Sequence, residues 1–136
     1  MQMSPYLNFN GQCEDAMKFY EKCLGGKITA MHTYEGTPAE QDVPAEWRKK
    51  IIHARLQVGD KFLMGSDAPP ERYRVPGGFS VTISPETVAE AERIFHALSE
   101  NGTVHMPIQK TFFAARFGMF VDRYKIPWMV ICEQVS

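Results

Sequence analysis

The chain has 136 residues, of which 44% are hydrophobic and 23% charged, and its formal net charge is −1. This size and balance are typical of one soluble globular domain, residues 1–136, and they argue against nucleic acid or a membrane surface as the main partner. Cys13, Cys23 and Cys132 are widely spaced, which favours reduced cysteines in a cytoplasmic protein over a disulfide framework.

The first half of the sequence predicts a strand, a helix and three more strands. Apolar and polar side chains alternate over residues 5–10, as they do in a strand with one buried face. Residues 13–24 carry an apolar stripe at helical spacing that ends at a Gly-Gly pair. Residues 27–35 predict the next strand, and residues 36–46 are polar and contain two prolines, which indicates a surface loop.

The clearest local pattern is a hairpin over residues 50–67. Gly59-Asp60 separates two alternating runs, which is typical of a two-residue hairpin with a type II′ turn. If Val58 pairs with Lys61, the register is fixed, and directly paired residues share a face. The further pairs are Gln57–Phe62, Leu56–Leu63, Arg55–Met64, Ala54–Gly65 and His53–Ser66. One face, suited to packing beneath a helix, carries Ile52, Ala54, Leu56, Leu63 and Gly65. The opposite face resembles a pocket wall and carries His53, Arg55, Gln57, Phe62, Met64 and Ser66.

The second half repeats this order after a break rich in proline and glycine. Residues 78–84 alternate like a strand, and Pro85 precedes a helical stripe from Val88 to Leu98. Three more strands are predicted, over residues 103–108, 112–121 and 126–132. We therefore predict an α+β fold of two βαβββ modules, about residues 4–68 and 77–133, whose mixed sheet curves into a half-open cup with both helices outside.

Three stretches resemble one known family. They are PYLNFNG with EDAMKFY (residues 5–11 and 14–20), HARL with MGSD (53–56 and 64–67), and MP, TFFAARFG, DRY and WMV (106–107, 111–118, 122–124 and 128–130). Together they resemble the PhnB-like branch of the vicinal oxygen chelate superfamily, which contains glyoxalases, extradiol dioxygenases and bleomycin-resistance proteins. The resemblance implies the glyoxalase/bleomycin-resistance/dihydroxybiphenyl dioxygenase-like fold and a homodimer. The family usually has glycine in the last turn, where this chain has Lys125.

Metal-dependent members of the superfamily hold a divalent ion with His, Gln or Glu from the first and fourth strand of each half. This chain instead offers non-ligands at the corresponding positions, which are Ser4 or Pro5, Met64, Gly78 and Met129. Its four histidines show no ligand spacing. We therefore expect no metal and no other cofactor. Some relatives carry a methyltransferase label, but no glycine-rich strand-to-helix loop is present to hold a methyl-donor nucleotide.

These observations predict a metal-free cavity for a small molecule. The hairpin contributes His53, Arg55, Met64 and Ser66, the opening strands contribute Tyr6, Asn8, Ser80 and Thr82, and Arg116 and Met129 are further candidates. Arg55 would select a compact anionic or carbonyl-bearing ligand, although either arginine can equally serve as a structural ion-pair partner. No nucleophile and base can be assigned, so catalysis stays open. The alternatives are a metal-dependent enzyme of the glyoxalase or dioxygenase type and a structural dimerisation module.

Overall fold

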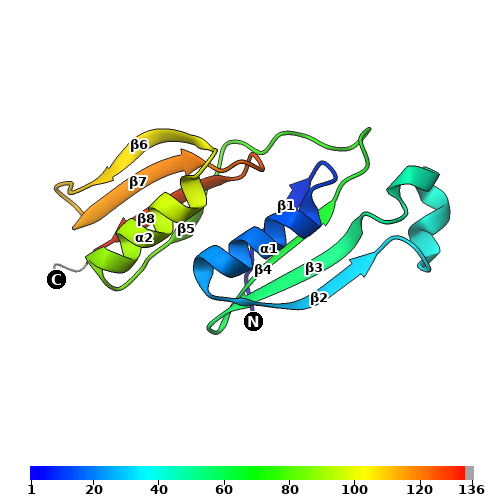
Figure 1. Cartoon of the computed structure of the whole chain (residues 1–136), viewed down its shortest axis with the longest axis horizontal. Helices are drawn as coiled ribbons and strands as arrows, with labels where there is room; N and C mark the ends of the chain where they lie inside the picture. The colour runs from blue at the N-terminus through cyan, green and yellow to red at the C-terminus, as the bar shows by residue number, and fades with distance from the viewer. Residues whose placement is uncertain (134–136) are drawn as a thin grey trace. The chain divides into compact units, whose positions relative to one another are not determined.

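One strand, one helix and three strands occur in this order twice along the chain (Figure 1). The computed structural model describes residues 1–133 and divides into two units, Met1–Arg74 and the part from Val75 onward. The first unit contains β1 (Tyr6–Phe9), α1 (Cys13–Leu24), β2 (Lys27–Thr33), β3 (Ile51–Val58) and β4 (Lys61–Asp67). The second contains β5 (Val81–Ile83), α2 (Val88–Ser99), β6 (Thr103–Gln109), β7 (Arg116–Val121) and β8 (Pro127–Cys132). The predicted βαβββ repeat is confirmed. That both sheets form one cup in a single domain stays a prediction.

Each unit has one four-stranded sheet, and the two sheets have equivalent strand orders. These orders are β1-β4-β3-β2 and β5-β8-β7-β6. The opening strand of each unit runs parallel to the last one, and the other neighbours are antiparallel. Within each unit, the helix packs on one face of the sheet (Figure 1). The mixed sheets and the helices confirm the predicted α+β class.

The hairpin between β3 and β4 has the predicted register from Val58–Lys61 back to Ala54–Gly65. Gly59 has a φ of +61°, whereas Asp60 is not among the residues with positive φ. A type I′ turn requires positive φ at both central residues, so this combination is that of the predicted type II′ turn. The turn therefore fixes which side chains of the hairpin face α1 and which face away from it.

Three predicted segments differ in detail from the structure. The loop over residues 36–46 contains two short 3-10 helices, η1 (Pro38–Asp42) and η2 (Ala45–Trp47). β5 is shorter than predicted, and Gly78, three residues before it, has a φ of +75°, which is not strand geometry. β7 starts at Arg116 rather than at residue 112, because the N–H of Thr111 donates to the carbonyl of Ala114 at 3.1 Å and closes a turn.

Each core lies between the helix and the face of the sheet that the helix covers. In the first unit, Leu7, Phe9 and Leu56 are buried together with one stripe of α1. In the second, the ring of Phe95 meets that of Phe120 edge to face, with centroids 5.2 Å apart. All three cysteines are buried, and burial raises the pKa of the Cys13 thiol. Neither helix in residues 1–133 has the length and hydropathy needed to span a membrane.

The two helices begin in different ways. The N–H of Cys13, the first residue of α1, donates to Oδ1 of Asp67 at 2.9 Å, and the N–H of Ile51 donates to Oδ2 at 2.9 Å. Asp67 is 1% exposed, and burial raises the pKa of its carboxyl although the two N–H donors act to lower it. α2 is preceded by Thr87, whose hydroxyl accepts a hydrogen bond from the N–H of Glu90 at 3.1 Å.

Candidate functional site

The first sheet has one face beneath α1 and a second face that α1 does not cover. We call the second one the open face. The parallel register of β1 and β4 pairs Tyr6 with Met64 and Asn8 with Ser66. The antiparallel register of β3 and β4 pairs Arg55 with Met64. Because paired residues share a face, the structure brings together the predicted residues of the first unit. They are Tyr6, Asn8, His53, Arg55, Met64 and Ser66.

Tyr6 and His53 contact each other across the open face. The Tyr6 hydroxyl and Nδ1 of His53 are 3.1 Å apart, and the two rings stack with centroids 5.8 Å apart and an interplanar angle of 26°. Their strands are separated by β4, so the tyrosine ring reaches over the middle strand to meet the imidazole. Tyr6 is still 45% exposed. The contact fixes the orientation of His53 and leaves its Nε2 without a hydrogen-bond partner among residues 1–133.

Arg55 is held in place by uncharged neighbours. Its Nε donates to the hydroxyl of Thr29 at 3.0 Å, and its guanidinium carbon lies 5.1 Å from the centroid of the Phe62 ring. The register of β2 with β3 shifts between Ile28 and Ala30, so Thr29 is the extra residue of a bulge that places its hydroxyl beside Arg55. No carboxylate within the described residues forms an ion pair with Arg55.

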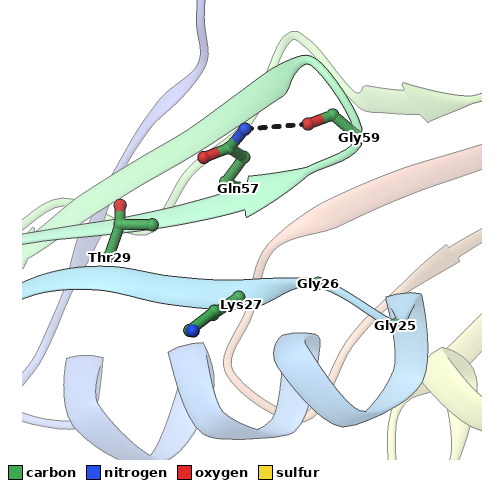
Figure 2. Close-up of a pocket in the computed structure, with 6 residues that line it drawn as sticks. All are labelled: Gly25, Gly26, Lys27, Thr29, Gln57 and Gly59. Carbon is green, nitrogen blue, oxygen red and sulfur yellow. Dashed lines mark hydrogen bonds between the residues drawn. The ribbon is translucent and has the colours of Figure 1, made fainter.

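A depression of about 350 Å³ lies beside this arginine, at the hairpin end of β2 and β3 (Figure 2). Its lining includes Thr29, Gln57 and Gly59, and Nε2 of Gln57 donates to the carbonyl of Gly59 at 3.0 Å. Gln57 lies on the open face because it alternates with the buried Leu56, and the Thr29 hydroxyl accepts from Arg55 of the same face. The depression therefore adjoins the open face, and Thr29 belongs to both.

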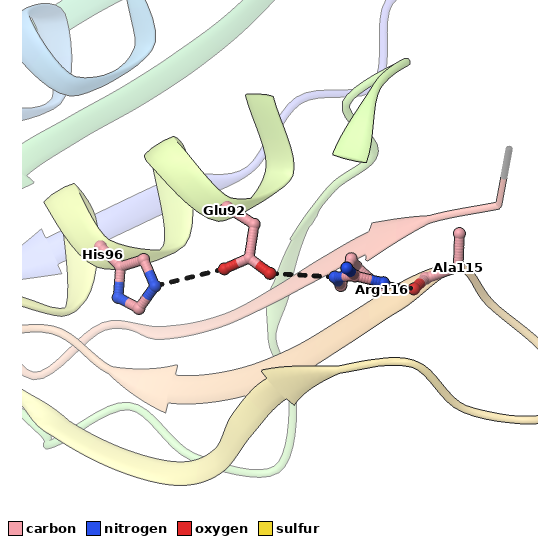
Figure 3. Close-up of polar contacts among 4 residues, drawn as sticks. All are labelled: Glu92, His96, Ala115 and Arg116. Carbon is pink, nitrogen blue, oxygen red and sulfur yellow. Dashed lines mark hydrogen bonds and ion pairs between the residues drawn. The ribbon is translucent and has the colours of Figure 1, made fainter. Parts of the chain in front are cut away.

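In the second unit, the predicted residues do not all share a face. Thr82 pairs with Met129, and Ser80 lies just before β5. Arg116 pairs with Cys132, which is buried on the α2 side. Nε of Arg116 donates to the carboxylate of Glu92 in α2 at 2.9 Å, and the same carboxylate lies 3.3 Å from Nε2 of His96 (Figure 3).

Arg116 therefore lies on the opposite face of the sheet from Thr82 and Met129, although the sequence analysis grouped all three as ligand-binding candidates. The β7–β8 register puts its side chain against the helix, where Glu92 neutralises it. Whether the candidate residues of the two units line one cavity stays a prediction.

Residues 1–131 match the family model described as 3-demethylubiquinone-9 3-methyltransferase. The chain belongs to this family. Protein YjdN of Escherichia coli is 32% identical, over 96% of this chain and 94% of that protein. The crystal structure of protein PA1353 from Pseudomonas aeruginosa is 47% identical, with a TM-score of 0.88 and 99% of each chain covered.

More distant structures connect the family with its wider fold. A putative 3-demethylubiquinone-9 3-methyltransferase of Bacillus cereus, also named PhnB protein, is 23% identical with a TM-score of 0.81 and covers 97% of this chain and 99% of its own. A glyoxylase/bleomycin resistance protein/dioxygenase domain from Frankia is 13% identical with a TM-score of 0.63, over 98% of this chain and 95% of that domain. The PhnB-like assignment and the predicted fold are both confirmed.

The residues of this PhnB-like chain do not fit the metal site known from the superfamily. The residue of the first strand that pairs with Met64 is Tyr6. Ser4 and Pro5, which the sequence suggested for this position, precede β1. The thioether of Met64 is a poor ligand for a hard or borderline divalent ion. Within each unit, the described residues bring no three His, Cys, Asp or Glu side chains into an arrangement that could hold a metal ion.

Two residues of the open face were missed by the sequence analysis. His32 of β2 pairs directly with His53, and Thr29 supports Arg55. If side chains alternated strictly from Lys27, Thr29 would lie on the face of Gln57 and His32 on the opposite face. The extra residue of the bulge reverses the alternation after it, so His32 lies on the same face as His53. Register and bulge are set by strand pairing, so alternation within β2 alone carried no signal for His32.

Proposed function

We propose that the open face binds a small molecule that carries an anionic or carbonyl group, and that it does so without a bound metal ion. The observation that supports this most directly is the state of Arg55. This residue projects from a sheet, is exposed, and is held by Thr29 and Phe62 rather than by a carboxylate. A guanidinium that is positioned but not neutralised retains its Nη donors for a ligand.

The two candidate arginines differ in a way that favours Arg55. Arg116 donates to Glu92, so a ligand anion would have to compete with an existing ion pair. Arg55 shares the open face with Tyr6, His53 and Met64, which supply hydrogen-bonding groups and an apolar side chain. A few polar groups among apolar side chains are the usual composition of a small-molecule site. Thr82, Met129 and Ser80 of the second unit remain further candidates for contact with the ligand.

The methyl transfer named in the family description finds no support in the strand-to-helix connections of this chain. The connections β1–α1 and β5–α2, residues 10–12 and 84–87, contain one glycine between them, Gly11. A nucleotide held at a helix N-terminus is usually cradled by a glycine-rich loop. We therefore propose ligand binding rather than methyl transfer.

The proposal includes a homodimer as the working form. Among residues 1–133, β6 pairs only with β7, and its side chains Val104 and Met106 are 44% and 36% exposed. Exposed strand edges commonly require a covering partner. Sedimentation equilibrium tests this directly, because a single species of 15.5 kDa at micromolar concentration would contradict the dimer.

The binding proposal is tested with the purified protein and small probes. Acetate, pyruvate and sulfate are titrated while backbone NMR signals are recorded, and shifts are expected at Tyr6, His53 and Arg55. Calorimetry then compares Arg55→Ala with Arg48→Ala, a control that removes the same charge from an exposed site outside the open face. Loss of a charge-assisted hydrogen bond costs on the order of 1.5–3 kcal/mol, which is about tenfold or more in affinity.

Two results would contradict the proposal. Elemental analysis of protein purified without chelator could find stoichiometric metal held by side chains of the open face, which would favour the metal-dependent enzyme. Equal affinities of the Arg55→Ala and Arg48→Ala variants for every probe that binds would remove Arg55 from the site.

A further inference from the structure

We propose that the open face recognises a doubly charged tetrahedral oxyanion, the phosphate group of a small organic molecule, through Arg55, His53 and His32, and that it binds this group more tightly in mildly acidic solution. The inference rests on the proposed function, because it assigns the ligand class of the same site. It starts from the distribution of charge. The chain contains 16 acidic residues against 15 lysines and arginines, yet none of the side chains that the strand register places on the open face is acidic.

The three groups are close enough to share one ligand. His32 and His53 are direct partners in the antiparallel ladder of β2 and β3, so their Cβ atoms are about 4.5–5.5 Å apart. Arg55 follows His53 on the same face of β3, about 7 Å further along the strand. A tetrahedral oxyanion presents oxygens in several directions, so it can contact the guanidinium and an imidazole together. A carboxylate has two oxygens, which one guanidinium can engage completely.

Tyr6 prepares His53 for this role. A neutral imidazole can accept the Tyr6 hydroxyl at Nδ1, and a charged imidazole can donate from Nδ1 to the hydroxyl oxygen. The tyrosine can therefore serve Nδ1 in both charge states. This leaves the Nε2–H of His53 as the donor for an anion, and protonation adds a full charge to that donor.

The expected pH dependence follows from the groups that face the two histidines. They are Tyr6 from β1 and Arg55 from β3, while β4 contributes the uncharged Met64 and Ser66; Lys27 begins the neighbouring strand β2. None of the side chains that the strand register places beside the pair is acidic. A dianion supplies the missing negative charge, so proton uptake by the histidines and anion binding reinforce each other.

Sulfate is the appropriate probe, because it remains a dianion across the range in which histidine gains its charge, about pH 8 to pH 5. Perchlorate has the same tetrahedral shape and a single charge. Calorimetry should show sulfate affinity rising about tenfold or more as the pH falls through this range, and perchlorate binding about tenfold more weakly than sulfate at the acidic end. Each tenfold change corresponds to about 1.4 kcal/mol.

The variants separate these histidines from the others. His53→Gln and the exposed His32→Gln should each retain sulfate binding near pH 8 but lose most of the increase on acidification. His105→Gln changes an exposed histidine on β6 in the second unit and should behave like the unmodified protein. Near pH 8, methyl phosphate should bind more tightly than inorganic phosphate, because its methyl group can contact Met64.

Several outcomes would overturn the inference. They are equal binding of sulfate and perchlorate, sulfate affinity that does not change with pH, and full retention of the pH effect in both glutamine variants. Equal binding of the two phosphates would refute an organic ligand. If acetate or pyruvate binds through Arg55 and sulfate does not, the oxyanion inference fails and the proposed function stands. If no probe perturbs the open face, both fail.

Discussion

The two units have the same strand order but secure the starts of their helices with different chemistry. In the first unit, a buried carboxylate at the end of β4 accepts the N–H of Cys13 and the N–H of Ile51, so Asp67 joins a helix and two strands. In the second unit, Thr87 caps α2 from the position just before the helix. The comparison teaches that one topology can be stabilised either by a long-range contact or by a local one.

The second unit places its buried carboxylate elsewhere. Asp122, 2% exposed, lies in the turn between β7 and β8, where Oδ1 accepts the N–H groups of Tyr124 and Ile126. Its Oδ2 accepts the indole N–H of Trp128 at 2.8 Å. The β3–β4 hairpin needs no aspartate of this kind, because Val58 pairs directly with Lys61 across its two-residue turn. Each unit thus uses one buried aspartate at the point where its backbone would otherwise leave N–H groups unsatisfied.

The largest expected effect separates the two helix caps. Asp67→Ala leaves two buried N–H groups without acceptors, each costing about 1–3 kcal/mol, so we expect a loss of on the order of 3 kcal/mol in the free energy of unfolding. Thr87→Ala removes a cap at an exposed helix start and should cost about 1 kcal/mol. Urea unfolding measures both, with the exposed Asp60→Ala as control. A loss for Thr87→Ala that equals or exceeds that for Asp67→Ala would break the distinction.

A smaller effect concerns pH, because only the first cap can titrate. Burial raises the pKa of Asp67 above the ordinary aspartate value of 3.8. Between the unfolded and the folded pKa, the folded chain holds a proton that the unfolded chain has released. The contribution of this proton to stability is therefore complete below the unfolded pKa and is lost as pH rises through the folded pKa. The loss amounts to about 1.4 kcal/mol for each pH unit that separates the two pKa values.

NMR titration of the Asp67 carboxyl carbon measures this pKa, and the midpoint should lie above 3.8. The destabilisation caused by Thr87→Ala should be the same throughout the titration, because a hydroxyl cap carries no charge. A midpoint at or below 3.8 would mean that the two N–H donors outweigh burial.

What could be predicted from the sequence depended on short-range constraints. The β3–β4 register followed from a two-residue turn and a period-two pattern, since a slip of one residue would expose the apolar face. That register placed Arg55, Met64 and Ser66 on one face. The repeat could be recognised because apolar and polar residues alternate and then change to helical spacing in the same order in both halves.

What could not be predicted depended on contacts between distant segments. Asp67 and Cys13 are 54 residues apart, and their contact requires the parallel pairing of β1 with β4. The side of the sheet on which Arg116 lies depends on the β7–β8 register, which a turn longer than two residues leaves open. His32 reached the open face because of one extra residue at Thr29. Each of these features depends on how two strands pair, which the sequence of neither strand determines alone.

The smallest expected effect tests how the two hairpin turns differ. Lys125 has a φ of +76° and Gly59 a φ of +61°, so both have positive φ, but only Gly59 does so without a side chain. A non-glycine residue there costs roughly 1–2 kcal/mol, and glycine costs about 0.5–1 kcal/mol in unfolded-state entropy. Lys125→Gly should therefore stabilise the protein by about 0.5 kcal/mol in urea unfolding. The opposite change Gly59→Lys, which places lysine at the first position of the type II′ turn, should destabilise it by more than this, because glycine is strongly preferred there. The backbone carbonyl of Asp122 accepts the N–H of Lys125 at 3.0 Å. Destabilisation by Lys125→Gly would contradict the prediction, and it would show that the contacts of the turn with Asp122 already offset the strain at Lys125.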